Sequence, residues 1–118
     1  MAADPRELVQ AYYAAVDAGD LERLLAMFHP AVEYRRGGYP PIRGAHELRH
    51  FYQEVRVIAS GRHRVDTVLV DGDRAAVRGS FAGTGRDGRE LAVQWADFFT
   101  LVDGLIHRRY TYFLAPGV

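Results

Sequence analysis

The sequence predicts an α+β domain in which helices come first and a sheet of long antiparallel strands follows. Apolar residues recur at helical spacing in the first half of the chain and at every second position from about residue 62. Gly-containing turn sequences at 71–73, 86–88 and 103–104 separate the alternating segments, as in consecutive hairpins. With 118 residues, no internal repeat and no linker, the chain is expected to form a single domain over residues 1–118.

The first helix is expected to run from Pro5 to about Asp17. Asp4 can cap its N-terminus, Pro5 suits its first turn, and Gly19 ends it. One apolar stripe recurs at 3.6-residue spacing, and Tyr12 lies near its centre, so the Tyr12 side chain should point inward. The stripe consists of Leu8, Ala11, Tyr12, Ala15 and Val16.

Two further helices are expected before the sheet. Asp20 can cap a second helix that carries Leu21, Leu24, Leu25 and Phe28 and ends at His29-Pro30. A short strand near 32–36 and a loop rich in Gly and Pro at 37–44 lead to a third helix over about 45–59. The alternating segments predict strands near 62–70, 74–83, 89–101 and 105–114.

The composition excludes several classes of function. Fifteen basic and fifteen acidic side chains leave no positive field for nucleic acid or anionic lipid. No apolar segment approaches the roughly 20 residues of a membrane helix, and the first residues do not resemble a signal peptide, so we expect a cytoplasmic protein. The absence of Cys and Lys excludes disulfides, thiol nucleophiles, thiolate metal sites and Schiff bases. Carboxylate, imidazole, phenol and guanidinium chemistry remains.

Two segments match ligand-binding motifs, but their contexts favour simpler interpretations. Residues His46 to His50 spell the zinc-binding pattern H-E-x-x-H on a predicted helix. Both imidazoles lie about 180° from the buried stripe of that helix, so we expect them at the surface. Residues Gly83 to Gly88 spell the dinucleotide pattern G-x-G-x-x-G, but a strand follows them, which indicates a hairpin loop. We therefore expect no metal and no cofactor. The stripe of the third helix consists of Leu48, Phe51, Tyr52, Val55 and Ile58.

Asp97 stands in the middle of a predicted strand among aromatic residues, which is an unusual place for a solvated carboxylate. In an apolar pocket, desolvation would raise its pKa, and the carboxyl group could donate a hydrogen bond or act as a general acid. The alternative is a buried structural carboxylate that pairs with an arginine. Alternation places Asp97 on one face with Val93, Trp95, Phe99 and Leu101.

The turn that follows decides which residue of the last strand faces Asp97. A three-residue loop at 102–104, which we favour, would pair Leu101 with Leu105 and place Asp97 opposite Arg109. A two-residue loop would place Tyr110 there instead. With the three-residue loop, the pocket face of the last strand would carry His107, Arg109, Thr111 and Phe113.

Several segments, in this order, carry a family resemblance: Val9 to Tyr12, Ala18 to Leu21, Phe28 to Arg35, Arg43-Gly44 with Phe51-Tyr52, and Trp95 to Phe99 before Asp103-Gly104. In them the chain resembles the SnoaL-like and ketosteroid-isomerase-like proteins of the nuclear transport factor 2-like superfamily. The resemblance implies a cone-shaped fold in which three N-terminal helices pack on a curved, mostly antiparallel sheet that encloses a pocket. It also implies a homodimer formed through the outer face of the sheet.

The resemblance implies roles for individual residues. Tyr12 matches the tyrosine of the isomerase oxyanion hole, and Asp97 matches its protonated aspartate. The proton-shuttling aspartate of the isomerase falls near Arg36 here, so that base is missing. In the related limonene-epoxide-hydrolase pattern, Asp97 matches one aspartate, while Trp95 stands at the arginine and Thr111 at the second aspartate.

Together these features predict an enzyme that transfers a proton next to the carbonyl group of a small apolar or aromatic ligand, as an isomerase, cyclase or dehydratase. Tyr12 and a protonated Asp97 would stabilise the oxyanion, and His107 or His63 would act as the base. The predicted substrate-binding residues are Trp95, Arg36, Arg109, Phe99, His63 and Thr111, with Arg36 or Arg109 holding an anionic substituent.

Two alternatives remain. One is a binding protein without chemistry. The other is a dimerisation module, in which Arg108, Tyr110 and Tyr112 would meet a second copy.

Overall fold

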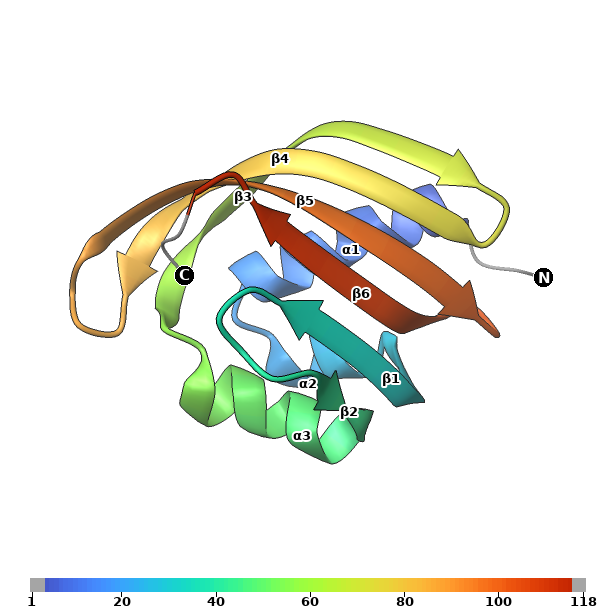
Figure 1. Ribbon diagram of the computed structural model, residues 1–118, viewed down its shortest axis with the longest axis horizontal. Helices are drawn as coiled ribbons and strands as arrows, with labels where there is room; N and C mark the ends of the chain where they lie inside the picture. The colour runs from blue at the N-terminus through green and yellow to red at the C-terminus, as the bar shows by residue number, and fades with distance from the viewer. Residues whose placement is uncertain (1–3, 116–118) are drawn as a thin grey trace.

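A six-stranded curved sheet forms one layer of the structure, and short helices cover its concave face (Figure 1). This computed structural model describes residues 4–115. The helical segments are α1 (Pro5–Asp17), α2 (Leu21–Leu25), α3 (Gly44–His50) and the π-helix η1 (Phe51–Val55). The strands are β1 (Phe28–Arg36), β2 (Ile42–Arg43), β3 (Ile58–Asp71), β4 (Arg74–Gly85), β5 (Glu90–Val102) and β6 (Leu105–Phe113). The α+β class predicted from the sequence is confirmed.

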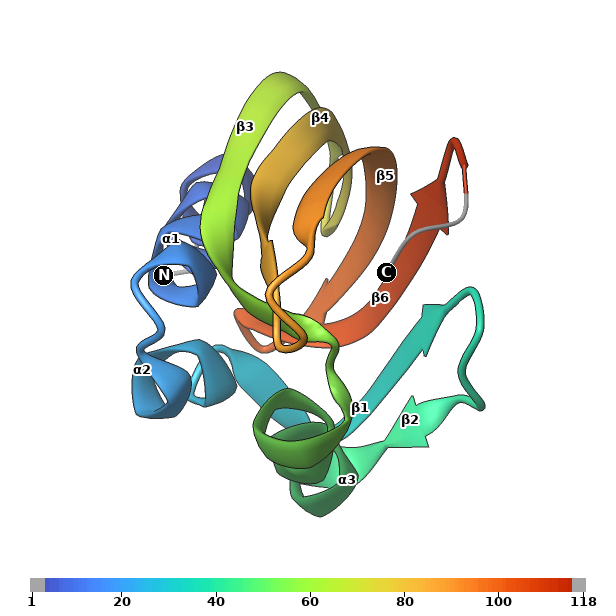
Figure 2. The same ribbon diagram turned by 90° about the vertical axis from the view of Figure 1, so that its left-hand side faces the viewer.

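The sheet has the strand order β2-β1-β6-β5-β4-β3, and only the β1–β6 pair is parallel. The long strands β3, β4 and β5 curl around the interior, while α1 packs beside β3 and α3 lies under β1 and β2 (Figure 2). No helix among residues 4–115 is long and apolar enough to cross a membrane.

Helix α1 has the predicted bounds. The Asp4 carboxylate accepts a hydrogen bond from the backbone N–H of Arg6 at 3.0 Å, and Gly19 takes the positive φ of 68° that ends the helix. Tyr12 is fully buried, as predicted. The inward stripe is rotated from the predicted one, because Val9 and Tyr13 are buried while Leu8 and Ala11 are only half-buried.

The second helix is shorter than predicted. Asp20 does cap it, accepting from the Arg23 backbone N–H at 3.2 Å, but α2 ends at Leu25, and Phe28 begins β1 instead of closing the helix. Pro30 therefore lies inside a strand. The strand tolerates it because the pairing of β1 with β6 is interrupted between Phe28 and Glu33, where no ladder N–H is required.

The third helix also ends earlier than predicted, because η1 replaces its second half and β3 begins at Ile58. The wider π-turn changes the angular spacing, so Val55 is exposed although it belongs to the predicted stripe. Leu48 and Phe51 are buried as expected, and Ile58 is buried from the strand. His46 and His50 are exposed, and residues 83–88 span the end of β4 and the turn that leads to β5, so a hairpin holds them as predicted.

The predicted register of the last hairpin is wrong in both of its versions. The loop has two residues, since Val102 pairs with Leu105 and both Asp103 and Gly104 have positive φ, the conformation of a type I′ turn. A bulge then shifts the pairing between Thr100 and Leu101, so that Thr111 lies opposite Asp97. His107 is the extra residue of this bulge.

Candidate functional site

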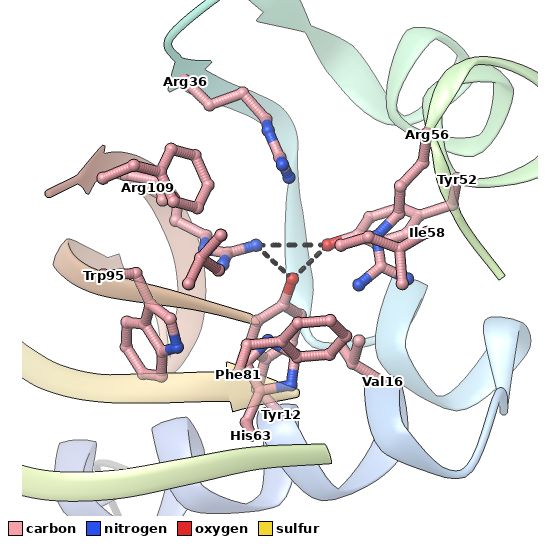
Figure 3. Close-up of a pocket in the computed structure, with 13 residues that line it drawn as sticks. Tyr12, Val16, Arg36, Tyr52, Arg56, Ile58, His63, Phe81, Trp95 and Arg109 are labelled. Carbon is pink, nitrogen blue, oxygen red and sulfur yellow. Dashed lines mark hydrogen bonds between the residues drawn. The ribbon is translucent and has the colours of Figure 1, made fainter. Parts of the chain in front are cut away.

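A narrow cavity lies between the concave face of the sheet and the segments α1 and η1 (Figure 3). The volume open to the centre of a water molecule is about 20 Å³, which is room for roughly one water. A wider surface groove of about 570 Å³ shares part of its wall, including Val16, Tyr52 and Arg56. The cavity is lined by Tyr12, Val16, Arg36, Tyr52, Arg56, Ile58, His63, Phe81, Val93, Trp95, Arg109, Thr111 and Phe113.

Asp97 has no exposed surface, and three side chains donate hydrogen bonds to its carboxylate. Arg109 Nη2 donates to Oδ2 at 2.9 Å, the Tyr13 hydroxyl donates to the same oxygen at 2.5 Å, and the Thr111 hydroxyl donates to Oδ1. These contacts suit an ionised carboxylate that neutralises a guanidinium. The structure thus contains the Asp97–arginine pair that the sequence left as an alternative.

The Tyr12 and Tyr52 hydroxyls form the polar centre of the cavity. They hydrogen-bond to each other, and Arg109 Nη1 donates to Tyr12 at 2.5 Å and to Tyr52 at 3.3 Å (Figure 3). Burial raises the pKa of both tyrosines and the Arg109 charge opposes it, so both hydroxyls keep their protons at neutral pH. One of the two protons lies between the hydroxyls. The other is left to donate to a ligand oxygen.

His63 reaches the cavity from β3 and is held by the last residue of α1. The Asp17 carboxylate accepts from His63 Nδ1 at 2.6 Å and from the His63 backbone N–H at 2.9 Å. Nε2 has no hydrogen-bond partner among residues 4–115. The ring is nearly buried, with Phe81 at 4.7 Å and Trp95 at 5.6 Å between ring centroids.

The environment keeps the His63 imidazole neutral. Burial lowers its pKa, and the hydrogen bond that His63 donates to Asp17, together with the charge of that carboxylate, opposes the effect only in part. A neutral imidazole with its proton on Nδ1 presents an unprotonated Nε2. Such a nitrogen can accept a proton from a molecule in the cavity, and the Asp17 carboxylate would then stabilise the imidazolium.

The structure brings most of the predicted site residues together. Tyr12, His63, Trp95, Arg36, Arg109 and Thr111 all line the cavity. Asp97 and Phe99 are buried behind its wall. His107 does not belong to the site, because the bulge moves it next to His29, with 5.0 Å between the ring centroids. The expectation that His107 faces the pocket is therefore wrong.

Sequence reasoning missed Asp17, Tyr52 and Arg56. Asp17 ends a helix, where a solvated carboxylate is ordinary, and its contact with His63 spans 46 residues. Tyr52 was placed in the apolar stripe of the third helix, and only the fold shows that its hydroxyl meets that of Tyr12. Arg56 lies directly after the π-helix η1. No sequence pattern predicted that the third helix would end there, so the direction of Arg56 could not be inferred.

Known proteins similar to this chain share its fold. A family model described as a SnoaL-like domain matches residues 9–109. No curated protein matches the chain. A nuclear transport factor 2-like protein of unknown function from Burkholderia pseudomallei has a TM-score of 0.85 at 22% identity, covering 94% of this chain and 91% of that one.

Two further solved structures carry functional descriptions. TerC, co-crystallised with polyporic acid, has a TM-score of 0.80 at 25% identity, with 92% of this chain and 90% of that chain covered. The epoxide hydrolase/cyclase-like enzyme SalBIII, which has a role in pyran ring formation in the polyether salinomycin, has a TM-score of 0.81 at 20% identity, with 92% and 89% covered. These likenesses confirm the cone-shaped nuclear transport factor 2-like fold.

Proposed function

This chain belongs to the SnoaL-like domain family, and from that premise we propose that it is an enzyme that moves a proton next to the carbonyl group of a small apolar or aromatic compound. The observation that carries the proposal is the His63–Asp17 pair in the wall of a cavity that also holds a hydroxyl donor. Isomerisation, cyclisation and dehydration all begin with such a step. The fold alone would not support it, because one fold hosts many functions.

In the proposed step, His63 Nε2 removes a proton from the carbon next to the carbonyl group. The electron pair of the broken C–H bond forms a carbon–carbon double bond, and the carbonyl oxygen gains the negative charge. The free hydroxyl proton of the Tyr12–Tyr52 pair then donates to that oxygen, and Arg109 stabilises the charge through both hydroxyls. The proton returns from His63 to another atom, so no electron acceptor is needed.

The test is proton exchange in D2O with two small ketones, acetophenone and 2-tetralone, followed by 1H NMR. We expect exchange faster than in buffer at neutral pH. We also expect kcat/KM to fall as the pH drops below about 6.5, the ordinary pKa of histidine, because protonation of His63 removes the base. Since burial lowers the pKa of His63, the midpoint should lie below that value.

Two outcomes would contradict this proposal. A midpoint above pH 7 would exclude a neutral, buried His63 as the base. Ketones that bind, as judged by their line widths, but exchange no faster than in buffer would indicate a binding protein without chemistry.

We also propose that the outer face of the sheet binds a second copy of the chain. Phe98 and Tyr112 are 52% and 58% exposed, and their rings meet edge to face with 5.8 Å between centroids. Aromatic side chains are enriched in protein interfaces, and these two lie on neighbouring strands, β5 and β6.

Sedimentation velocity tests the second copy. We expect the wild type to sediment as a dimer and the Phe98→Glu, Tyr112→Glu double variant as a monomer with an unchanged circular dichroism spectrum, because two charges would be buried in the contact. Val57→Glu, at an exposed position outside the sheet, is the matched control and should remain dimeric. A monomeric wild type, or a double variant that stays dimeric, would contradict the proposed face.

A further inference from the structure

Three arginines line the cavity, and their positive charge is only partly compensated. Arg109 pairs with Asp97, but Arg36 and Arg56 form no ion pair among residues 4–115. Arg36 is only 8% exposed. Buried charges in proteins are normally paired, because transfer out of water is expensive. The cavity therefore carries two guanidinium groups for which residues 4–115 supply no counter-ion.

Arg36 is held in place by groups that do not neutralise it. Its Nη1 donates to the Tyr34 hydroxyl at 3.0 Å, and its guanidinium carbon lies 5.1 Å from the Phe113 ring centroid and 5.3 Å from that of Phe51. Such cation–π contacts orient the side chain. In Figure 3, Arg36 extends from β1 toward the centre of the cavity.

Arg56 lines the same cavity from the segment after η1, on the side of Tyr52 (Figure 3). Its guanidinium carbon lies 5.5 Å from the Tyr52 ring centroid. Burial lowers its pKa, and the nearby charge of Arg36 acts in the same direction. The two cations thus repel each other across a space in which residues 4–115 place no carboxylate partner for either of them.

Unpartnered donors support the same conclusion. The Nε atoms of Arg36 and Arg56 and the Trp95 Nε1 are buried, and no described residue accepts a hydrogen bond from them. Buried donors without partners are rare in folded proteins, and a ligand is one of the ordinary explanations. All three belong to residues that line the cavity.

We propose that the substrate carries a carboxylate that binds between Arg36 and Arg56. This inference rests on the proposed proton transfer and names the substrate class for that site: a small cyclic or aromatic keto acid. A planar carboxylate accepts two parallel N–H bonds from a guanidinium, and it is smaller than a tetrahedral phosphate or sulfonate, which suits a narrow cavity. Arg109, the other predicted holder of an anion, is already neutralised by Asp97.

The experiment compares three acetophenones that differ at one position: 4-acetylbenzoate, its neutral methyl ester and 4-acetylbenzenesulfonate. Binding is measured by calorimetry, and exchange of the acetyl protons in D2O is measured by 1H NMR. We expect the carboxylate to bind at least tenfold more tightly than the ester, and more tightly than the sulfonate. In Arg36→Gln and Arg56→Gln, the preference for the carboxylate over the ester should fall by about 10- to 100-fold, as for lost hydrogen bonds to a charged group.

Arg62→Gln is the matched control, because Arg62 is exposed on β3 and its loss changes the net charge equally. It should keep the full preference. Equal binding of carboxylate and ester, or an unchanged preference in both arginine variants, would overturn the inference. A preference for the sulfonate would reassign the ligand. If Arg36→Gln does not fold, Arg56→Gln alone decides.

Binding and exchange separate the two proposals. Tight, arginine-dependent binding of 4-acetylbenzoate without exchange would refute the proton transfer and keep the carboxylate site. If the acid and the ester exchange their protons with equal efficiency, the proton transfer is kept and the carboxylate site is refuted.

Discussion

Replacing His63 with Gln is expected to lower kcat for α-proton exchange by about 10²- to 10⁴-fold, the usual contribution of a general base. Gln keeps a polar side chain of similar length but cannot accept and carry a proton at neutral pH. Asp17→Asn should give a smaller loss, because the ring keeps a hydrogen-bonding neighbour but loses the carboxylate that orients it and stabilises its charged form. The rates follow from 1H NMR exchange in D2O at several pH values.

The matched control is His46→Gln, since His46 is exposed on α3 and does not line the cavity. Its kcat should equal that of the wild type. A folded His63→Gln variant that retains more than half of the wild-type kcat would refute the role of His63 as the base.

Asp97→Asn is expected to destabilise the protein by about 3–5 kcal/mol, measured by chemical denaturation at neutral pH. The substitution preserves shape but leaves the Arg109 guanidinium buried without a counter-charge. It also replaces one of the two acceptor oxygens with an NH2 group, which cannot accept the hydrogen bond that the carboxylate oxygen accepts. A small domain has only about 5–15 kcal/mol of unfolding free energy, so a large share of its stability would be lost.

Two further variants distinguish the charge pair from simple loss of a hydrogen bond. Thr111→Val removes one hydroxyl donor to Asp97 and should lower the unfolding free energy by about 1.5–3 kcal/mol, less than the loss of the counter-charge. Asp97→Asn combined with Arg109→Met should be more stable than Asp97→Asn alone, because no uncompensated charge remains. An Asp97→Asn loss below 1 kcal/mol would show that Asp97 is not the counter-ion on which the fold depends.

Local sequence signals predicted an element well where residues within it or directly beside it determine its bounds and its buried face. The bounds of α1 follow from Asp4 and Gly19, which act on neighbouring backbone groups. The face of β5 that carries Trp95 and Asp97 follows from simple alternation. Elements whose bounds depend on distant partners were placed less well: Phe28 joins β1 because β6 offers it a pairing position.

The register of β5 and β6 shows why part of the site could not be predicted. A turn determines only the pairs beside it, and a bulge further along moves every later pair. The Asp103-Gly104 sequence suits both loop lengths, and nothing near His107 marks a bulge. The site depends equally on contacts between distant segments, such as Asp17 with His63 and Tyr12 with Tyr52, which no periodicity reveals.

The central claim is that His63 is a neutral base whose Nε2 faces the cavity without a proton, and NMR of the protein with 15N-labelled histidine tests it most directly. The nitrogen shifts identify the protonation state and the tautomer of each ring during a pH titration. We predict a neutral His63 at pH 7 with its proton on Nδ1 and a titration midpoint below about 6.5. An imidazolium at pH 7, or a proton on Nε2, would contradict the account.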